Sequence, residues 1–263
     1  MMNNPYYLIK NSFAPIFSAF SLLSIMCLTT SFMWKTTHAG LSLTFCILTL
    51  NFIFLYWFIE TYRESLLLNT MTFFEDKSLL FSFLLFIVSE IMFFFSFFWS
   101  YLHYSFSPDF ELGNAWPPMG LTPIPFFETP LLNTIVLLSS GVSITWAHHM
   151  FYNYNSKFSI SLLVMLTILL GVYFSFLQWE EYSTALFSIN DSVYGSGFFT
   201  ATGFHGVHII VGSLLLFSVL VKLLMGVNPM DFQAHFETAA WYWHFVDVVW
   251  LFLFLCMYWW GGA

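Results

Sequence analysis

The stretch LLFSFLLFIVSEIMFFFSFFWSYLHY, residues 79–104, decides the fold class of this chain. It carries a single acidic residue, Glu90, and no lysine or arginine. An α-helix needs ~20 predominantly apolar residues to cross the ~30 Å hydrocarbon core of a bilayer. The stretch is long enough and almost free of charge, and it therefore predicts a transmembrane helix.

The same pattern recurs along the rest of the chain. Charged residues make up only 8% of the sequence, against roughly a quarter in an average soluble domain. Apolar stretches that hold no charge, one internal carboxylate such as Asp247, or a lysine only at one end, as Lys222, predict spans at residues 15–34, 41–59, 79–104, 131–152, 158–179, 193–224 and 238–260. We therefore expect an all-α polytopic membrane protein with seven transmembrane helices.

Composition argues against several function classes. The cysteines Cys27, Cys46 and Cys256 lie far apart inside apolar stretches, which disfavours a disulfide framework and a thiolate metal centre. The formal net charge of −8 disfavours nucleic-acid binding. The N-terminal segment has no basic region and no cleavage site of a secretory signal, so we expect the first span to be retained.

The basic residues predict the orientation in the membrane. With seven spans, one face of the membrane receives Lys10, Arg63, Lys77, Lys157 and Lys222, and the other receives only Lys35. Lysine and arginine accumulate on the cytoplasm-like side, which is the matrix in a mitochondrion. We therefore expect the N-terminus in the matrix and the C-terminus in the intermembrane space.

Two connections divide the chain. Six of the nine prolines fall between Pro108 and Pro130, and proline is excluded from helix interiors. Residues 105–130 are therefore expected to form a structured loop on the outer face. The polar residues 63–77 are expected to connect an N-terminal two-helix unit, residues 1–62, to a five-helix bundle, residues 78–263.

Glu90 is the sharpest functional candidate. It lies about eleven residues into its span, or roughly 17 Å along the helix axis. A charge near the bilayer centre costs at least ~2.5 kcal/mol on insertion scales. One interpretation is an acid that handles protons or contacts lipid, and the other is a protonated structural glutamate bonded to a neighbouring helix.

Other polar residues are predicted inside or at the ends of spans. His244 and Asp247 share a helical face at spacing i, i+3 and could form either a proton relay or a structural hydrogen-bonded pair. For the individual histidines a structural hydrogen bond is the safer expectation. The predicted structural polar cluster comprises His148, His149, His205, His208, His244 and Asp247.

Two other kinds of membrane protein are disfavoured. A di-iron desaturase or hydroxylase needs histidine boxes on one membrane face, but His38 and His103 are predicted on the outer side and His148 on the inner, and no H-x-x-H-H box occurs. An independent transporter or channel needs a polar path or matched broken helices. Only a few polar residues, on different spans, could line such a path.

Five segments of the sequence together identify a family. They are WPPMG at residues 116–120, PLLNT at 130–134, SGVSITWAHH at 140–149, ATGFHGVH at 201–208 and AWYWHFVDVVW at 240–250. With these five motifs in this order, the chain resembles the third subunit of cytochrome c oxidase, of the mitochondrial type. The match covers most of the chain from about residue 60 onwards, whereas the first two spans match only in length and hydropathy.

The resemblance implies an arrangement and a role. Two helices and five helices would surround a lipid cleft in the mitochondrial inner membrane. The chain would be an accessory core subunit of respiratory complex IV, which passes electrons from cytochrome c to O2 and pumps protons. It would pack against catalytic subunit I, with subunit II and small accessory subunits as further partners. The equivalent subunit of a quinol oxidase is the nearest alternative.

The resemblance also implies site residues. Glu90 matches the family's carbodiimide-reactive intramembrane glutamate. The lipid-cleft candidates are Trp57, Phe58, Tyr62, Arg63, Glu64, Phe86 and Glu90. The family carries haem A and copper in partner subunits, and this chain would hold bound phospholipids but no catalytic residue, metal or redox centre. A two-copper or haem site would also need ligand sets that the sequence lacks.

Overall fold

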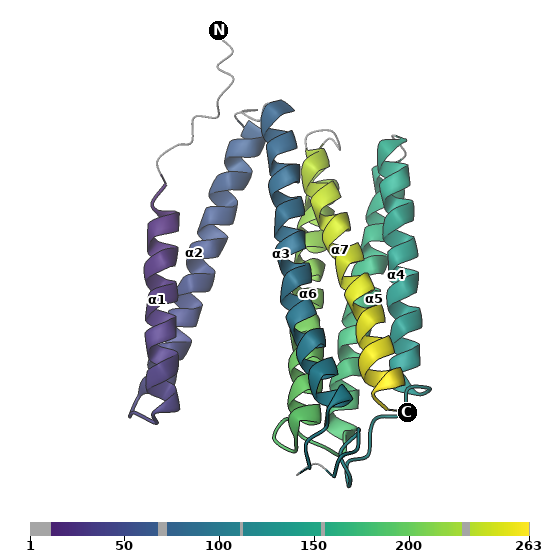
Figure 1. The fold of residues 1–263 in the computed structure, drawn as a ribbon. Coiled ribbons are helices and arrows are strands. Elements are labelled where there is room, and N and C mark those ends of the chain that lie inside the picture. Colours follow the sequence, from purple (N-terminus) through teal and green to yellow (C-terminus); the bar gives the residue numbers. More distant parts are fainter. Residues whose placement is uncertain (1–11, 68–72, 111–112, 154–155, 228–231, 263) are drawn as a thin grey trace. The chain divides into compact units, whose positions relative to one another are not determined.

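Seven long helices make up the part of the chain that the structure, a computed structural model, describes (Figure 1). That part comprises residues 12–67, 73–110, 113–153, 156–227 and 232–262. The α-helices are α1 Ala14–Met33, α2 Ala39–Leu67, α3 Phe73–Phe106, α4 Thr129–Tyr152, α5 Lys157–Thr184, α6 Val193–Leu224 and α7 Gln233–Leu253. A π-helix, η3 Phe254–Trp260, continues α7 directly. All seven are long and apolar enough to cross a membrane, which confirms the predicted fold class.

Local sequence sets where several helices begin. Pro15 and Pro130 occupy the first turns of α1 and α4, where a missing N–H costs nothing. The Ser156 side chain accepts a hydrogen bond from the Ser159 N–H and caps α5. The Ser192 side chain accepts from the N–H groups of Tyr194 and Gly195 and caps α6.

The segment predicted as a connection between residues 63 and 77 is shorter in the structure. Residues 63–67 continue α2, and residues 73–77 already belong to α3. Hydropathy marks where a helix leaves the apolar core and not where its backbone stops. Arg, Glu and Leu are good helix formers, so these helices extend beyond their apolar spans.

The chain divides into two compact units, Met1–Ser78 and Leu79–Ala263, which we call unit 1 and unit 2. In unit 1, α1 and α2 pack against each other, and the Ser12 hydroxyl donates to Glu60 at 2.7 Å. Large apolar side chains such as Phe17, Phe20 and Leu55 are exposed on this hairpin. Such surfaces suit contact with lipid or with another membrane protein.

In unit 2, Trp243 of α7 contacts three neighbouring helices and is fully buried. Its indole N–H donates to the Ser140 hydroxyl of α4 at 2.9 Å. A Cβ on Gly171 of α5 would lie 2.5 Å from the Trp243 ring, and one on Gly212 of α6 would lie 3.1 Å from it. These two glycines therefore let α5 and α6 approach the indole closely, as small residues do between membrane helices.

The proline-rich connection between α3 and α4 is an ordered loop where it is described. Trp116 packs against Tyr101 of α3 and Tyr194 of α6, with ring centroids 5.2 and 5.4 Å apart. We call the end of unit 2 that carries this connection, residues 107–128, the loop end. The C-terminal helix η3 finishes at the same end (Figure 1).

A candidate intramembrane site at Glu90

Glu90 lies midway along α3 and contacts α6. Its carboxylate oxygen Oε2 is 2.9 Å from Nε2 of His208. The side chains are only partly accessible, at 22% for Glu90 and 12% for His208. The contact therefore joins two helices through ionisable groups in the middle of their spans.

The other nitrogen of His208 makes a hydrogen bond within α6. Nδ1 lies 2.7 Å from the carbonyl oxygen of Phe204, which can only accept, so Nδ1 carries a hydrogen. Nε2 then either donates to a carboxylate as part of an imidazolium or accepts from a carboxylic acid. Either hydrogen bond requires one proton between the two side chains, carried by Nε2 or by the carboxyl group.

Aromatic rings surround His208. Phe94 lies edge-on with its centroid 5.0 Å from the imidazole, and Tyr242 stacks on it at 6.2 Å and 14°. Phe245 completes the enclosure from α7 at 6.1 Å. These rings limit access of water, which strengthens the electrostatic interaction within the pair.

His205 has a different set of contacts although it lies one turn from His208. It is buried, its Nε2 lies 3.2 Å from the carbonyl oxygen of Val246, and its ring lies 5.2 Å from that of Trp250. His208 therefore connects α6 to α3, whereas His205 connects α6 to α7.

The remaining members of the predicted polar cluster make separate contacts. His244 and Asp247 approach to 3.8 Å on α7. At the end of α4 opposite the loop end, His148 stacks on Phe236, and the Nε2 of His149 lies 3.0 Å from the side-chain amide of Asn153. Within the described residues, His244 and Asp247 are the only two members of the set whose side chains contact each other through polar atoms.

The lipid-cleft candidates belong to two units. Trp57, Phe58 and Arg63 lie in unit 1, and the side chains of Tyr62 and Glu64 are outside the described residues. Phe86 lies in unit 2 with Glu90, is 45% exposed, and stacks on Tyr242 at 6.4 Å and 13°. Tyr242 therefore stacks on both Phe86 and His208, and His208 in turn contacts Glu90.

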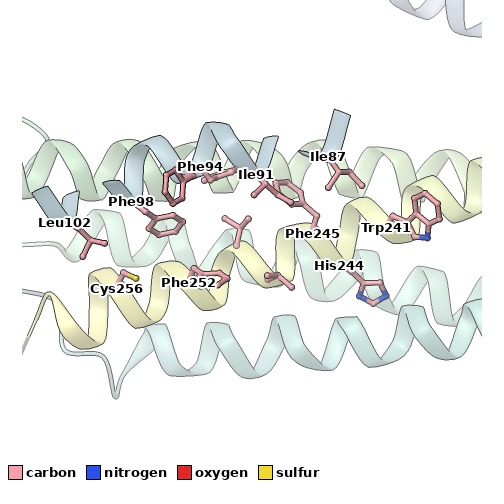
Figure 2. A pocket seen from close by; sticks show the side chains of 13 residues that line it. Ile87, Ile91, Phe94, Phe98, Leu102, Trp241, His244, Phe245, Phe252 and Cys256 are labelled. Carbon is pink, nitrogen blue, oxygen red and sulfur yellow. The ribbon is translucent and has the colours of Figure 1, made fainter. Parts of the chain in front are cut away.

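A groove that the sequence does not reveal lies between α3 and α7 (Figure 2). It has a volume of about 670 Å³. Ile91 and Phe98 line it from α3 and Phe252 lines it from α7, with Trp241 and His244 toward one end. An almost wholly apolar groove of this kind suits hydrocarbon.

Glu181 is a buried carboxylate that is not among the site residues predicted from the sequence. It is 2% exposed and accepts a hydrogen bond from the Tyr258 hydroxyl at 2.6 Å. One signal could have identified it. Phe174, Leu177, Gln178 and Glu181 recur at helical spacing on one buried face of α5, whereas the adjacent Glu180 is exposed.

A second unexpected contact lies at the end of unit 2 opposite the loop end. The ammonium of Lys222 lies 2.7 Å from Nδ1 of His235, and the other ring nitrogen lies 2.9 Å from the Ser218 hydroxyl.

Among the described residues, no three His, Cys, Asp or Glu side chains are grouped so that they could hold a metal ion.

Comparison with known proteins gives one consistent result. Residues 4–262 match the family described as Cytochrome c oxidase subunit III. The chain is 47% identical over 259 residues to cytochrome c oxidase subunit 3 of Coturnix japonica, covering 98% of this chain and 97% of that protein. Identity is 45% over 263 residues with that of Paracentrotus lividus, covering 98% of each chain. It is 42% over 262 residues with that of Heterololigo bleekeri, covering 100% of each chain.

Proposed function

This chain belongs to the cytochrome c oxidase subunit III family, and on that premise we propose how it serves the oxidase. It is an accessory subunit of cytochrome c oxidase, the oxidoreductase of respiratory complex IV. It lies in the mitochondrial inner membrane as a multi-pass protein, and other subunits of the oxidase are its partners.

The proposed role is to stabilise catalytic subunit I and to aid proton uptake during the transfer of electrons from cytochrome c to O2. The observation that carries this role is the contact between Glu90 and His208 at 2.9 Å. It places two ionisable side chains in contact midway along α3 and α6, where they could share a proton. In this proposal haem A and copper lie in the partner subunits, including subunits I and II, and this chain has no redox centre.

Phospholipids are the second proposed ligand. The exposed apolar side chains of α1 and α2 and the groove between α3 and α7 suit acyl chains. Arg63 is exposed at the end of α2 and could pair with a lipid phosphate. Bound lipid of this kind would support sustained turnover by stabilising the contact with the catalytic subunit.

The proposed orientation places the N-terminus in the matrix and the loop end in the intermembrane space. Lys157 and Lys222 lie at the end of unit 2 opposite the loop end, where the Lys157 ammonium donates to the carbonyl of Gly226 at 2.8 Å. Their position agrees with the accumulation of basic residues on the matrix side.

The substitution Glu90→Gln tests the proton-related role. The glutamine amide can still donate to Nε2 of His208, so the oxidase should assemble. The side chain no longer exchanges a proton, so turnover should decay faster or proton uptake should change. Both are measured on the purified complex in vesicles.

Glu180→Gln is the matched control because Glu180 is an exposed carboxylate at the end of α5. It should leave turnover and proton uptake unchanged. Wild-type behaviour of Glu90→Gln in both assays would reject the proton-related role and leave a structural one.

A further inference from the structure

Polar side chains from three elements meet inside unit 2 near the loop end. Glu181 of α5 accepts from the Tyr258 hydroxyl of η3 at 2.6 Å and from the Thr129 hydroxyl of α4 at 3.4 Å. The Gln178 side-chain amide lies 3.4 Å from both Glu181 and Tyr258. Glu181, Gln178 and Tyr258 are all buried, whereas Thr129 at the edge of the network is partly exposed.

Two contacts fix the register between α4 and α5. Thr129 meets Glu181 near the loop end, and Ser143 meets Thr167 at 2.8 Å deeper in the unit. The two helices are antiparallel, so each residue further along α4 lies level with one residue earlier in α5. Asn133, one turn beyond Thr129, therefore lies at the level of Leu177 and Gln178.

Several polar atoms at this level have no partner among the residues that the structure describes. Asn133 is fully buried, and neither its amide oxygen nor its amide nitrogen makes a hydrogen bond there. The same holds for Oε1 of Gln178 and for the indole N–H of Trp250. The Trp250 ring lies 5.7 Å from that of Tyr258, so the indole adjoins the same network.

We propose that Asn133, Gln178 and Glu181 line an internal site for ordered water between α4, α5 and the C-terminal helix. The unpartnered atoms include two acceptors, Oδ1 of Asn133 and Oε1 of Gln178, and two donors, Nδ2 of Asn133 and the Trp250 N–H. Water is a small ligand that serves donors and acceptors together, and buried water characteristically bridges such groups.

The position of the site favours water over larger ligands. Asn133 is 0% exposed, so a lipid head group or a side chain of a partner subunit does not reach it. Glu181 lies within one turn of the end of α5 at Thr184, which places the site next to the aqueous region at the loop end. The site is separate from the Glu90–His208 pair and does not depend on the role proposed for that pair.

X-ray hydroxyl-radical footprinting of the intact, purified oxidase tests the site. The radicals form from water, including ordered internal water, and oxidise the side chains that it touches. Tyr258 is 1% exposed and Trp243 is 0% exposed. Trp243 is the reference because its N–H is already bonded to Ser140. Tyr258 and Trp250 should be oxidised at least severalfold faster than Trp243, as measured by mass spectrometry.

A pair of variants links the labelling to the site. Asn133→Leu removes both unpartnered amide atoms at similar volume and should reduce oxidation of Tyr258 severalfold, with Trp243 unchanged. Asn51→Leu is the matched control at an exposed position of α2, where the Asn51 amide donates to the Ile47 carbonyl of its own helix at 3.0 Å. It should leave Tyr258 labelling at the wild-type rate.

The outcomes are decisive even if Asn133→Leu fails to assemble. Equal oxidation of Tyr258, Trp250 and Trp243 in the wild-type complex would overturn the proposal, because direct side-chain contacts would then account for the site. Gln178→Met provides a second variant that removes the unpartnered oxygen. Unchanged Tyr258 labelling in an assembled Gln178→Met or Asn133→Leu complex would also overturn it.

Discussion

At the scale of single residues, Glu90 and His208 depend on each other. Neither side chain is tolerated alone in a low-dielectric region, because a buried polar group without a partner is strongly destabilising. The hydrogen bond from His208 to Phe204 fixes the imidazole, so the nitrogen that faces Glu90 is always the same one.

This dependence predicts the effect of His208→Phe. The substitution leaves the Glu90 carboxyl without its partner and should destabilise the association of α3 with α6 by about 0.6–2 kcal/mol, the range that model peptides and double-mutant cycles give for hydrogen bonds between membrane helices. Thermal inactivation of the purified oxidase measures the loss.

The double variant Glu90→Leu, His208→Phe should recover part of that loss, because it removes both polar groups. His103→Phe, at an exposed position of α3, is the control and should leave thermal inactivation unchanged. Strictly additive effects in the double variant would show that the two side chains are not coupled.

The residue scale also shows what one sequence can and cannot predict. Glu90 is identifiable because a single carboxylate interrupts an apolar stretch. Its partner is not, because eight histidines are present and the sequence alone does not say which helices adjoin. Glu181 is not identifiable for another reason. It follows Glu180 just beyond the end of a predicted span, where charged residues are common and give no sign of burial.

At the scale of elements, α7 organises unit 2 through Trp243. The indole lies against Gly171 and Gly212 and bonds to Ser140, so one side chain relates α7 to α4, α5 and α6. The apolar spans predict these helices well, because membrane thickness sets their length. Their ends are predicted less well, because hydropathy gives no signal once a helix has left the apolar core.

Gly171→Ala should be destabilising. The new methyl group would lie 2.5 Å from the Trp243 ring, so the indole or α5 must shift. Overpacking of this kind costs about 1–3 kcal/mol, and it should appear as a lower inactivation temperature of the assembled oxidase.

Gly206→Ala is the matched control on α6. Its new methyl group meets no atom within 4 Å. Alanine is also the better helix former by about 1 kcal/mol. Stability should therefore be unchanged or slightly higher, and a loss equal to that of Gly171→Ala would contradict the packing role of Gly171.

At the scale of the whole molecule, charge and helix count together predict the orientation. Cysteine labelling in mitoplasts tests it. Asp109→Cys, in the loop that follows α3, should react with a membrane-impermeant maleimide from outside. Asn153→Cys, at the end of α4, should react only after permeabilisation. The reverse pattern would place the N-terminus in the intermembrane space.

Membership of the oxidase is the claim on which the rest depends, and it is tested most directly on the native complex. The complex is purified from mitochondria through this chain, and its reduced-minus-oxidised visible spectrum and its substrate oxidation are recorded. Haem A bands together with oxidation of cytochrome c are the predicted result. A complex without haem A, or one that oxidises quinol in place of cytochrome c, would contradict the assignment.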